Sequence, residues 1–380
     1  MNYLIQGNQL FRKGKLKEAL LTYQKAIEWA PNSELPNLKS AEVLEILGNK
    51  EDAIAHYYRA IELNPNSAWL HYKLGKLLVK SSKLDRGIKI LKTGLKFNPK
   101  SYKYYKELGN ALAQREEWEE AIENYQKAAE LNRSLSIQEH NVIDFKSQLF
   151  QDKWVIMMIQ GKQRGVFLEI GSTDGVELNN TFCLEKNFSW SGICVEPNPD
   201  FFQKLCENRT AITFPYAFYK QSGQIVEFIP NGVFGTISKF SYSDHHASKR
   251  EKFVAEQSTI KVITACPEDI LSLYNFPKYF DFLSLDVEGA ELDILESIIL
   301  SEWYPALACV EHNYVADRRL EIFELFSSYG YQRMECKWDD WYYNLEVLQS
   351  MNPEIPVCHY QRVLEYFCQH HNYKLNNKKK

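Results

Sequence analysis

The segment Gly165-Val-Phe-Leu-Glu-Ile-Gly-Ser-Thr-Asp-Gly175 joins an apolar run to a glycine-containing turn. The run Val166–Ile170 predicts a short buried strand, and we expect a helix from the turn to Lys186. A second apolar run, Gly192–Val195, predicts the next strand. Strand, helix and strand in this order are typical of a β-α-β unit, whose two strands lie parallel in one sheet.

The alternation continues through the second half of the chain. We expect further strands at Ala211–Ala217, Phe280–Leu285 and Ala306–Glu311, a final strand pair at Tyr331–Lys337 and Trp341–Val347, and helices at Asp200–Glu207, Ala290–Leu300 and Asp317–Tyr329. This pattern predicts an α/β domain with a mostly parallel sheet and helices on both faces. Ligands in such domains bind at the carboxyl ends of the strands, where Gly171, Glu196 and Asp286 fall.

The first turn carries an acidic residue that a phosphate-binding turn lacks. It reads Glu169-Ile-Gly-Ser-Thr-Asp-Gly175 rather than Gly-x-Gly-x-x-Gly, and the carboxylate of Asp174 would repel a phosphate but attract a sulfonium or ammonium group. Glu196 ends the next strand, where an acid can accept hydrogen bonds from both ribose hydroxyls. These features favour S-adenosylmethionine over a nicotinamide dinucleotide, so an oxidoreductase is disfavoured.

Several separated motifs resemble those of FkbM-type methyltransferases. They are Gly165–Gly175, Asn180–Lys186, Gly192–Pro199 and Asp281–Leu295, with further matches at Ser147–Asp152 and Asp339–Tyr342. The resemblance covers about residues 145–345 and implies a class I (Rossmann-like) methyltransferase fold that uses S-adenosylmethionine. It also implies O-methylation, typically of sugar or other secondary-metabolite hydroxyls. The chain departs from the family at Ser172-Thr173, where Ala-Asn is commoner.

The resemblance assigns cofactor roles to matching positions of this chain. By role, these positions are Glu169, Gly171, Thr173, Asp174 and Gly175 around the methionine part, Glu196 at the ribose, Pro197 and Asn198 beside the adenine, and Asn180 supporting the loop or touching the cofactor.

Methyl transfer to a hydroxyl requires alignment of donor and acceptor and a group that takes the proton. Asp286 is the leading candidate, because its strand faces the methyl group in this fold. Glu288 is a second candidate, although it could instead cap the helix that starts at Ala290. His312 could take the proton beside Asp286, or it could be structural. We predict no metal ligands and leave open whether a divalent metal assists.

The segment 232–252 is irregular and polar, and we expect it to form a lid on the acceptor side. It contains Asp244, His245, His246 and Arg250. His246 or Arg250 could touch the substrate, although such polar groups are more often solvated.

The first third of the chain repeats with a period of 34 residues. Small residues recur at Gly7, Ala41, Gly75 and Gly109, and Pro31, Pro65 and Pro99 end the first three units. Small residues allow two helices to approach closely, and proline stops the second helix of each unit. The pattern resembles the tetratricopeptide repeat and predicts an all-α solenoid of about four repeats over residues 1–135. Its groove would dock a protein or peptide partner, or the repeats would be a dimerisation or spacer module.

Charge and cysteine usage differ between the two parts of the chain. The repeats carry a net charge of +6 and the remainder carries −10, and all eight cysteines lie after residue 182 with no Cys-x-x-Cys pair. The overall charge of −4 is too small to indicate a nucleic-acid or membrane partner. With no signal peptide and no apolar run near about 20 residues, the sequence predicts a reduced, cytoplasmic protein without a membrane span.

The predicted organisation has four parts. The repeats at 1–135 are followed by a connecting helix at 136–164, with the helical pattern running from Ser136 to Ile159. The methyltransferase domain spans 165–350, and a C-terminal tail spans 351–380, in which we expect His370, His371 and the run Lys378–Lys380 to be solvated.

These features together predict an S-adenosylmethionine-dependent O-methyltransferase that acts on a hydroxyl of a sugar, glycan or secondary metabolite. Its repeats would dock a partner or a polymeric acceptor. The alternative is an interaction scaffold in which the repeats act and the methyltransferase-like domain is catalytically degenerate. The intact set of Glu169, Gly171, Glu196 and Asp286 favours the enzyme.

Overall fold

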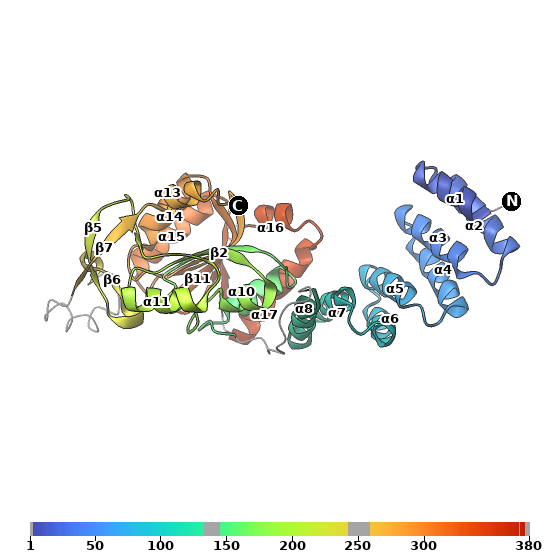
Figure 1. The fold of residues 1–380 in the computed structure, drawn as a ribbon, viewed down its shortest axis with the longest axis horizontal. Coiled ribbons are helices and arrows are strands. Elements are labelled where there is room, and N and C mark those ends of the chain that lie inside the picture. The colour runs from blue at the N-terminus through green and yellow to red at the C-terminus, as the bar shows by residue number, and fades with distance from the viewer. Residues whose placement is uncertain (1–2, 133–144, 242–258, 372, 377–380) are drawn as a thin grey trace. The chain divides into compact units, whose positions relative to one another are not determined.

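The computed structural model describes residues 3–132, 145–241, 259–371 and 373–376. The chain divides into two compact units, Met1–Ile137 and Gln138–Lys380. The first is helical and the second combines helices with strands (Figure 1). The predicted order of an all-α repeat unit followed by an α/β domain is therefore confirmed.

Eight helices form the described part of the first unit, and each packs on the next along the chain. They are α1 (Tyr3–Arg12), α2 (Leu16–Trp29), α3 (Glu34–Ile46), α4 (Lys50–Leu63), α5 (Ala68–Lys80), α6 (Leu84–Phe97), α7 (Tyr102–Gln114) and α8 (Trp118–Asn132). The most extensive contacts join α1 to α2, α3 to α4, α5 to α6 and α7 to α8. Each 34-residue unit of the sequence is therefore one helix pair.

The recurring small residues allow the close approach within each pair. A β-carbon on Gly75 would lie 2.6 Å from Cγ of Leu91, and one on Gly109 would lie 2.5 Å from the ring of Tyr125. Both distances are shorter than real side chains tolerate, so larger residues would separate the two helices. The repeating glycine is thus a packing requirement of the solenoid.

In the described residues, the main sheet of the second unit has eight strands in the order β12-β10-β11-β9-β8-β1-β2-β3. They are β1 (Val166–Ile170), β2 (Ser191–Val195), β3 (Ile212–Phe214), β8 (Tyr279–Leu285), β9 (Tyr304–Glu311), β10 (Gln332–Glu335), β11 (Asp339–Tyr343) and β12 (Lys374–Asn376). The strands from β9 to β3 are parallel to one another. The others pair antiparallel. The sheet is mixed, with a parallel centre.

The strand order reverses beside β1. The chain adds β2 and β3 on one side of β1, and it later adds β8 and β9 on the other side. Open α/β sheets bind ligands at the carboxyl ends of the strands that flank such a reversal. The ends of β1, β2 and β8 therefore mark the expected site.

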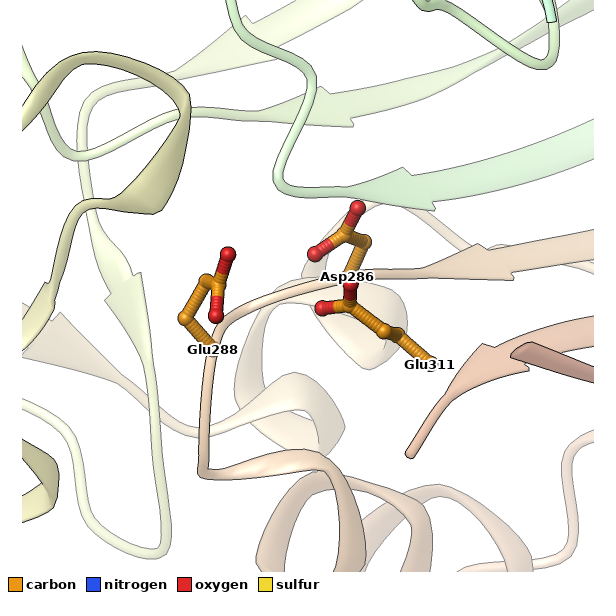
Figure 2. A group of neighbouring side chains, drawn as sticks. All are labelled: Asp286, Glu288 and Glu311. Atoms are coloured by element: carbon orange, nitrogen blue, oxygen red, sulfur yellow. The ribbon is translucent and has the colours of Figure 1, made fainter. Parts of the chain in front are cut away.

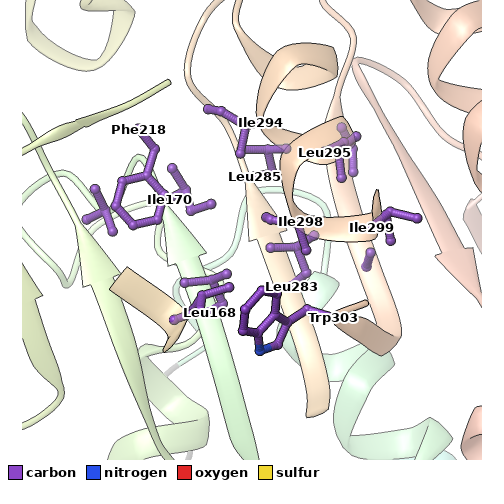
Figure 3. Packing of buried hydrophobic residues seen from close by; sticks show 14 of the residues in the cluster. Leu168, Ile170, Phe218, Leu283, Leu285, Ile294, Leu295, Ile298, Ile299 and Trp303 are labelled. Carbon is purple, nitrogen blue, oxygen red and sulfur yellow. The ribbon is translucent and has the colours of Figure 1, made fainter. Parts of the chain in front are cut away.

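Three helices pack on one face of the sheet: α13 (Pro267–Leu273), α14 (Glu291–Leu300) and α15 (Ala316–Ser328). Figure 3 shows Ile294 and Ile298 of α14 beside Leu168, Leu283 and Leu285 of the central strands. These strand residues alternate with residues that point to the opposite face.

The opposite face is covered by helices from both ends of the second unit. Trp154 of α9 (Gln151–Met158) contacts Trp341 of β11, which also contacts Phe367 of α17 (Val357–His371). The remaining α-helices in the described residues of this unit are α10 (Phe182–Phe188), α11 (Pro199–Asn208) and α16 (Leu345–Met351). Helices on both faces were predicted, and this expectation is confirmed.

A smaller sheet precedes β8 in the chain and has the order β4-β7-β5-β6. Its strands are β4 (Ala217–Phe218), β5 (Ile225–Ile229), β6 (Thr236–Ile237) and β7 (Ile260–Ala265), with short 3-10 helices η1 (Gly232–Phe234) and η2 (Ser238–Phe240).

The expected helix between the first turn and Lys186 is shorter than predicted. Residues 171–181 form a loop, and α10 begins only at Phe182. The amides of Thr181 and Phe182 donate to the side-chain oxygen of Asn179 rather than to a preceding helical turn. Because this side chain binds the amides in place of backbone carbonyls, the helix begins later than predicted.

The predicted connecting helix is also shorter. Within Ser136–Ile159, residues 136–144 lie outside the described part, and residues 145–150 are not helical. The amides of Lys146 and Ser147 donate to the carboxylate of Asp152, and α9 starts at Gln151.

The described residues of the C-terminal segment 351–380 pack on the rest of the second unit. Tyr360, Val363 and Phe367 form a buried face of α17, and β12 pairs with β10 at the sheet edge. The apolar residues recur at helical spacing, which is why this segment packs. The predicted last strand is likewise shortened, because β11 ends at Tyr343 and Asn344 caps α16.

None of the described helices is long and apolar enough to cross a membrane.

Candidate functional site

Gly171 lies at the reversal of strand order and against the end of β8. Its φ is +87°, and a β-carbon here would overlap the carbonyl oxygen of Asp286. Only glycine satisfies both the backbone angle and the close approach. The turn after β1 and the turn after β8 are thereby held together.

A cavity of about 340 Å³ opens beside this contact. Its volume is within the range of small-molecule pockets, about 300–1,000 Å³. The predicted residues that line it are Gly171, Thr173, Glu196, Pro197, Asp286 and Glu288. Further lining residues include Gln148, Phe228, Glu311, Asn313, Tyr314 and Trp338. The structure thus brings together residues from the ends of β1, β2, β8 and β9.

Glu196 is a buried carboxyl at the end of β2. The amide of Thr173 donates to its Oε2 at 2.9 Å, and the amide of Asn198 donates to its Oε1 at 2.8 Å. Burial raises its pKa to about 8, assisted by the negative charge of Asp286 and opposed by the two amides. The carboxyl is therefore fixed in direction and titrates near neutral pH.

Pro197 and Asn198 differ in where they lie. Pro197 lines the cavity, whereas Asn198 is buried and does not line it. The side chain of Asn198 accepts from the amide of Asp200 at 3.1 Å and so caps α11, whose first residue is Pro199. Its function in this position is to hold the loop and the helix after β2.

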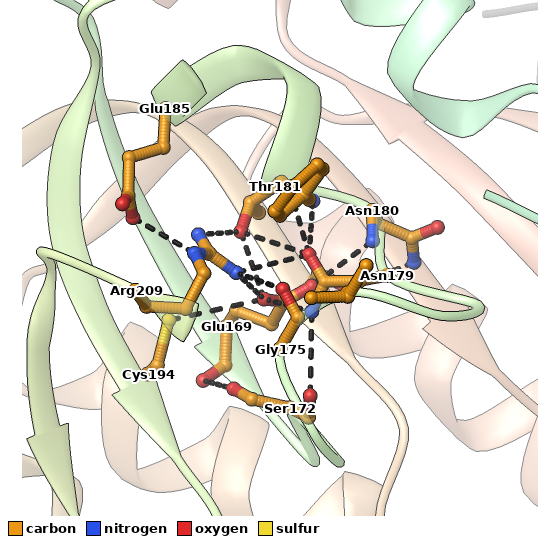
Figure 4. A network of polar contacts seen from close by, with 12 residues as sticks. Glu169, Ser172, Gly175, Asn179, Asn180, Thr181, Glu185, Cys194 and Arg209 are labelled. Carbon is orange, nitrogen blue, oxygen red and sulfur yellow. Dashed lines mark hydrogen bonds and ion pairs between the residues drawn. The ribbon is translucent and has the colours of Figure 1, made fainter. Parts of the chain in front are cut away.

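Glu169 does not line the cavity; it anchors the loop from beneath. Figure 4 shows its carboxylate in a buried network. It accepts from Asn179 Nδ2 at 2.8 Å, from the amide of Asn180 at 3.1 Å and from Thr181 Oγ1 at 2.8 Å. Arg209 Nη1 lies 3.3 Å from the same carboxylate. Glu169 therefore supports the loop that we expect to surround the methionine part of the cofactor.

Arg209 and Asn179 are loop supports that the sequence did not reveal. The guanidinium of Arg209 is fully buried and also donates to Glu185 at 2.8 Å and to Thr181 Oγ1 at 2.7 Å. Arg209 follows α11, so sequence distance hides its contact with Glu169.

Asp174 and Gly175 also stand outside the cavity lining. Oδ1 of Asp174 accepts from the amides of Val176 at 2.9 Å and Glu177 at 3.0 Å. Gly175 has a φ of +78° and packs on Arg209. Both residues shape the turn; a contact of Asp174 with a cationic ligand stays a prediction.

Asn180 has a partly unsatisfied side chain near the cavity. Its Nδ2 donates to Ser284 Oγ at 2.9 Å, while its buried Oδ1 has no hydrogen-bond partner. It borders a small adjoining pocket together with Asp286 and Glu311. Both predicted roles, loop support and ligand contact, fit this position.

Asp286, Glu288 and Glu311 form an acidic cluster in the cavity (Figure 2). One carboxylate oxygen from each lies within 4.8 Å of the others. Asp286 is exposed, whereas Glu288 and Glu311 are buried. Burial and the neighbouring Asp286 raise the pKa of Glu311. Glu311 was not among the predicted site residues, although it ends its strand as Glu196 does.

Glu288 does not cap α14. The N-terminus of α14 has no side-chain cap; Oε1 of Glu291 accepts from the amides of Gly289 at 2.8 Å and Val287 at 3.4 Å, which belong to the turn before the helix. Glu288 instead accepts from Asn313 Nδ2 at 3.0 Å and has a φ of +57°. A left-handed backbone at a residue other than glycine is a strain that functional sites often hold.

His312 is not among the residues that line the cavity. Its Nδ1 accepts from the amide of Tyr314 at 3.1 Å, and its Nε2 lies 3.6 Å from Oδ1 of Asp340. Arg319 binds the same carboxylate through two bonds of 2.8 and 2.7 Å. This geometry matches the structural alternative for His312 rather than a place beside Asp286.

Part of the expected lid reaches the cavity. Residues Gly232 to Gly235 line it, together with Phe228 of β5. Asp244, His245, His246 and Arg250 lie outside the described residues.

Comparisons with known proteins assign both units. Residues 169–333 match the family described as methyltransferase FkbM domain. Residues 2–33, 43–82 and 72–135 match tetratricopeptide repeat families. No curated protein matches the chain.

Solved structures similar to the chain include two that carry the name MamA. MamA from Desulfovibrio magneticus RS-1 is 25% identical over 34% of this chain and 73% of that chain, with a TM-score of 0.33. Another crystal structure of MamA is 22% identical over 36% and 78% of the two chains, with a TM-score of 0.34. Pseudomonas aeruginosa pilF is 21% identical over 35% and 61%, with a TM-score of 0.32. The family matches show that this chain carries a methyltransferase FkbM domain preceded by tetratricopeptide repeats.

Proposed function

We propose that the second unit transfers a methyl group from S-adenosylmethionine to a hydroxyl oxygen of a sugar, glycan or secondary metabolite. The repeats would dock a protein partner or a polymeric acceptor. The observation that carries the donor assignment is the position of Glu196. It is a buried carboxyl at the end of β2, fixed by Thr173 and facing a cavity at the reversal of strand order.

The donor would lie along the ends of β1 and β2. Two ribose hydroxyls can donate to the oxygens of Glu196, whose remaining lone pairs are free of the amides of Thr173 and Asn198. Pro197 and Phe228 supply apolar surface for a flat base. The methionine part would pass Gly171, where the missing side chain leaves room.

The transfer would be an in-line displacement. A bond forms between the acceptor oxygen and the methyl carbon, the bond between sulfur and that carbon breaks, and the sulfonium becomes a neutral thioether. The acceptor's proton needs a base, and Asp286 is exposed in the cavity. The protein's main contribution is alignment and exclusion of water.

The first unit offers a surface suited to a partner. Trp69 is 48% exposed on α5, Lys73 lies 5.7 Å over its ring, and Lys76 lies 5.9 Å over that of Tyr72. Aromatic and basic side chains together, with the net charge of +6 on the repeats, favour an acidic peptide or polymer.

Calorimetric titration with S-adenosylhomocysteine tests the donor assignment. We expect the full chain to bind one equivalent, and Glu196→Gln to weaken binding at least about tenfold, because the neutral amide loses acceptor capacity. Glu207→Gln, an exposed acid on neighbouring α11, is the matched control. Failure of the unaltered protein to bind would favour the scaffold alternative.

The base assignment needs a turnover measurement. Labelled methyl donor and mass spectrometry across glycan acceptors would identify a substrate. Asp286→Asn should then lower kcat far more than it lowers donor affinity. Retained turnover would place the base elsewhere.

A further inference from the structure

The acidic cluster of Asp286, Glu288 and Glu311 comes from two adjacent parallel strands. Leu285 of β8 is in register with Val310 of β9, so the next residues, Asp286 and Glu311, emerge side by side at the carboxyl edge. Glu288 follows after a left-handed turn that returns its carboxylate toward the other two. The tertiary fold thus concentrates three carboxylates at one wall of the cavity.

Glu311 provides a second and independent observation. Its side chain is only 7% exposed and lines the cavity, yet its Oε2 accepts no hydrogen bond from an amide, hydroxyl or cationic group, and the group that faces it is the carboxyl of Asp286. A buried carboxylate oxygen without a partner is costly. The unsatisfied atom faces the space that Asp286 and Glu288 also border.

The surrounding groups orient this cluster without neutralising Glu311. Asn313 donates to Oε2 of Glu288, and Thr236 donates to the backbone carbonyl of Glu288. The nearby arginines of α15 are engaged by other acids, Arg318 with Glu291 and Arg319 with Asp340. Carboxylates that bind metals are typically oriented by hydrogen bonds from neighbouring groups of the protein.

We propose that Asp286, Glu288 and Glu311 bind a divalent cation of the magnesium and manganese class. The ligand set contains only carboxylate oxygens, which suits hard cations and not zinc or copper. Three protein ligands leave coordination positions for water and for an acceptor hydroxyl. Binding of the cation does not depend on the proposed methyl donor, whereas its use in positioning the acceptor rests on the proposed function.

The proposal changes the expected part played by Asp286. A cation would hold and polarise the acceptor oxygen, and Asp286 would be one of its ligands, while the carboxylate oxygen of Asp286 that does not bind the cation would accept the acceptor's proton. It also accounts for the accumulation of negative charge beside Glu196, which a donor with a single positive charge would only partly offset.

Titration of the chelator-treated full chain with MnCl2, followed by electron paramagnetic resonance, tests the site. We expect one saturable site and competition by MgCl2. Glu311→Gln should weaken Mn²⁺ binding at least about tenfold. Without metal, the same variant should melt at an equal or higher temperature than the unaltered protein, because a buried, partnerless oxygen and its repulsion are removed.

Three further variants make the result specific. Asp286→Asn changes an exposed ligand and should also weaken Mn²⁺ binding, which keeps the test available if Glu311→Gln does not fold. Glu227→Gln, an exposed acid on β5, should have no effect. Glu196→Gln should keep Mn²⁺ affinity within about twofold while losing S-adenosylhomocysteine.

The outcomes separate this proposal from the proposed function. Absence of saturable Mn²⁺ binding, or binding unchanged by both Glu311→Gln and Asp286→Asn, would overturn the metal site. If S-adenosylhomocysteine still binds in that case, the donor assignment stands. If Mn²⁺ binds as expected but S-adenosylhomocysteine does not, the metal site stands and the donor assignment fails.

Discussion

The amide of Thr173 donates a 2.9 Å hydrogen bond to Oε2 of Glu196, joining the turn after β1 to the end of β2. Thr173 adopts a φ of +48° to present this amide. The two residues are distant in sequence, and their contact sets the direction of the carboxyl of Glu196, which we assign to the ribose.

The affinity for S-adenosylhomocysteine should rise with pH. The pKa of Glu196 is raised to about 8 by burial, so the carboxyl is mostly protonated at pH 6.5 and mostly ionised at pH 8.5. The ionised form accepts more hydrogen bonds, and the gain across this range should be roughly tenfold. Calorimetry at matched ionic strength measures it. Glu196→Gln should show a flat profile; an equal slope in both proteins would remove Glu196 as the cause.

Gly171→Ala should unfold or severely destabilise the second unit, by at least about 3 kcal/mol. Its β-carbon would overlap the carbonyl of Asp286 at a φ of +87°. Gly223→Ala is the matched control, since Gly223 has a φ of +78° but open space around the β-carbon. That variant should cost only about 1–2 kcal/mol. Thermal melting of both would decide, and equal effects would mean that the backbone angle alone is responsible.

Arg209→Met should destabilise the second unit by about 3–5 kcal/mol, because it leaves buried carboxylates without their cation. Arg209 pairs with Glu169 at 3.3 Å and with Glu185 at 2.8 Å. Urea unfolding provides the measurement. Lys204→Met, at an exposed position on α11, should change stability little. A small effect of Arg209→Met would show that Glu169 does not depend on this ion pair.

A chain of residues 138–380 should fold alone and bind S-adenosylhomocysteine within about twofold of the full chain. The boundary between the two compact units falls between Ile137 and Gln138. The main hydrophobic core of the second unit is formed by its own sheet and helices. Circular dichroism and calorimetry would report folding and binding. An insoluble product would mean that the repeats complete the domain, and the boundary would have to move.

The sequence predicted the architecture because its signals are local or periodic. A 34-residue period with Gly75 and Gly109 at equivalent places shows the repeat directly. Strands that end in Glu196 and Asp286 predicted a site at the carboxyl edge, and both residues line the cavity. The rule could also have found Glu311, which ends its strand in the same way.

The sequence was less informative about what each acid contacts. Glu169, Asp174 and His312 have residue types suited to chemistry, yet their partners are Arg209, backbone amides and Asp340. Such partners come from other elements or from local turn geometry. A residue type alone cannot distinguish a side chain that holds a loop from one that meets a ligand.

The sequence by itself therefore determined two units, their classes and the edge of the sheet where ligands bind. Hydrophobic periodicity and turn residues act over short distances, so they can be read along the chain. Only the tertiary structure decided that Asp286, Glu288 and Glu311 meet in one cavity while Glu169 lies beneath it. Strand register and the reversal beside β1 bring these side chains together, and both arise from packing between segments far apart in sequence.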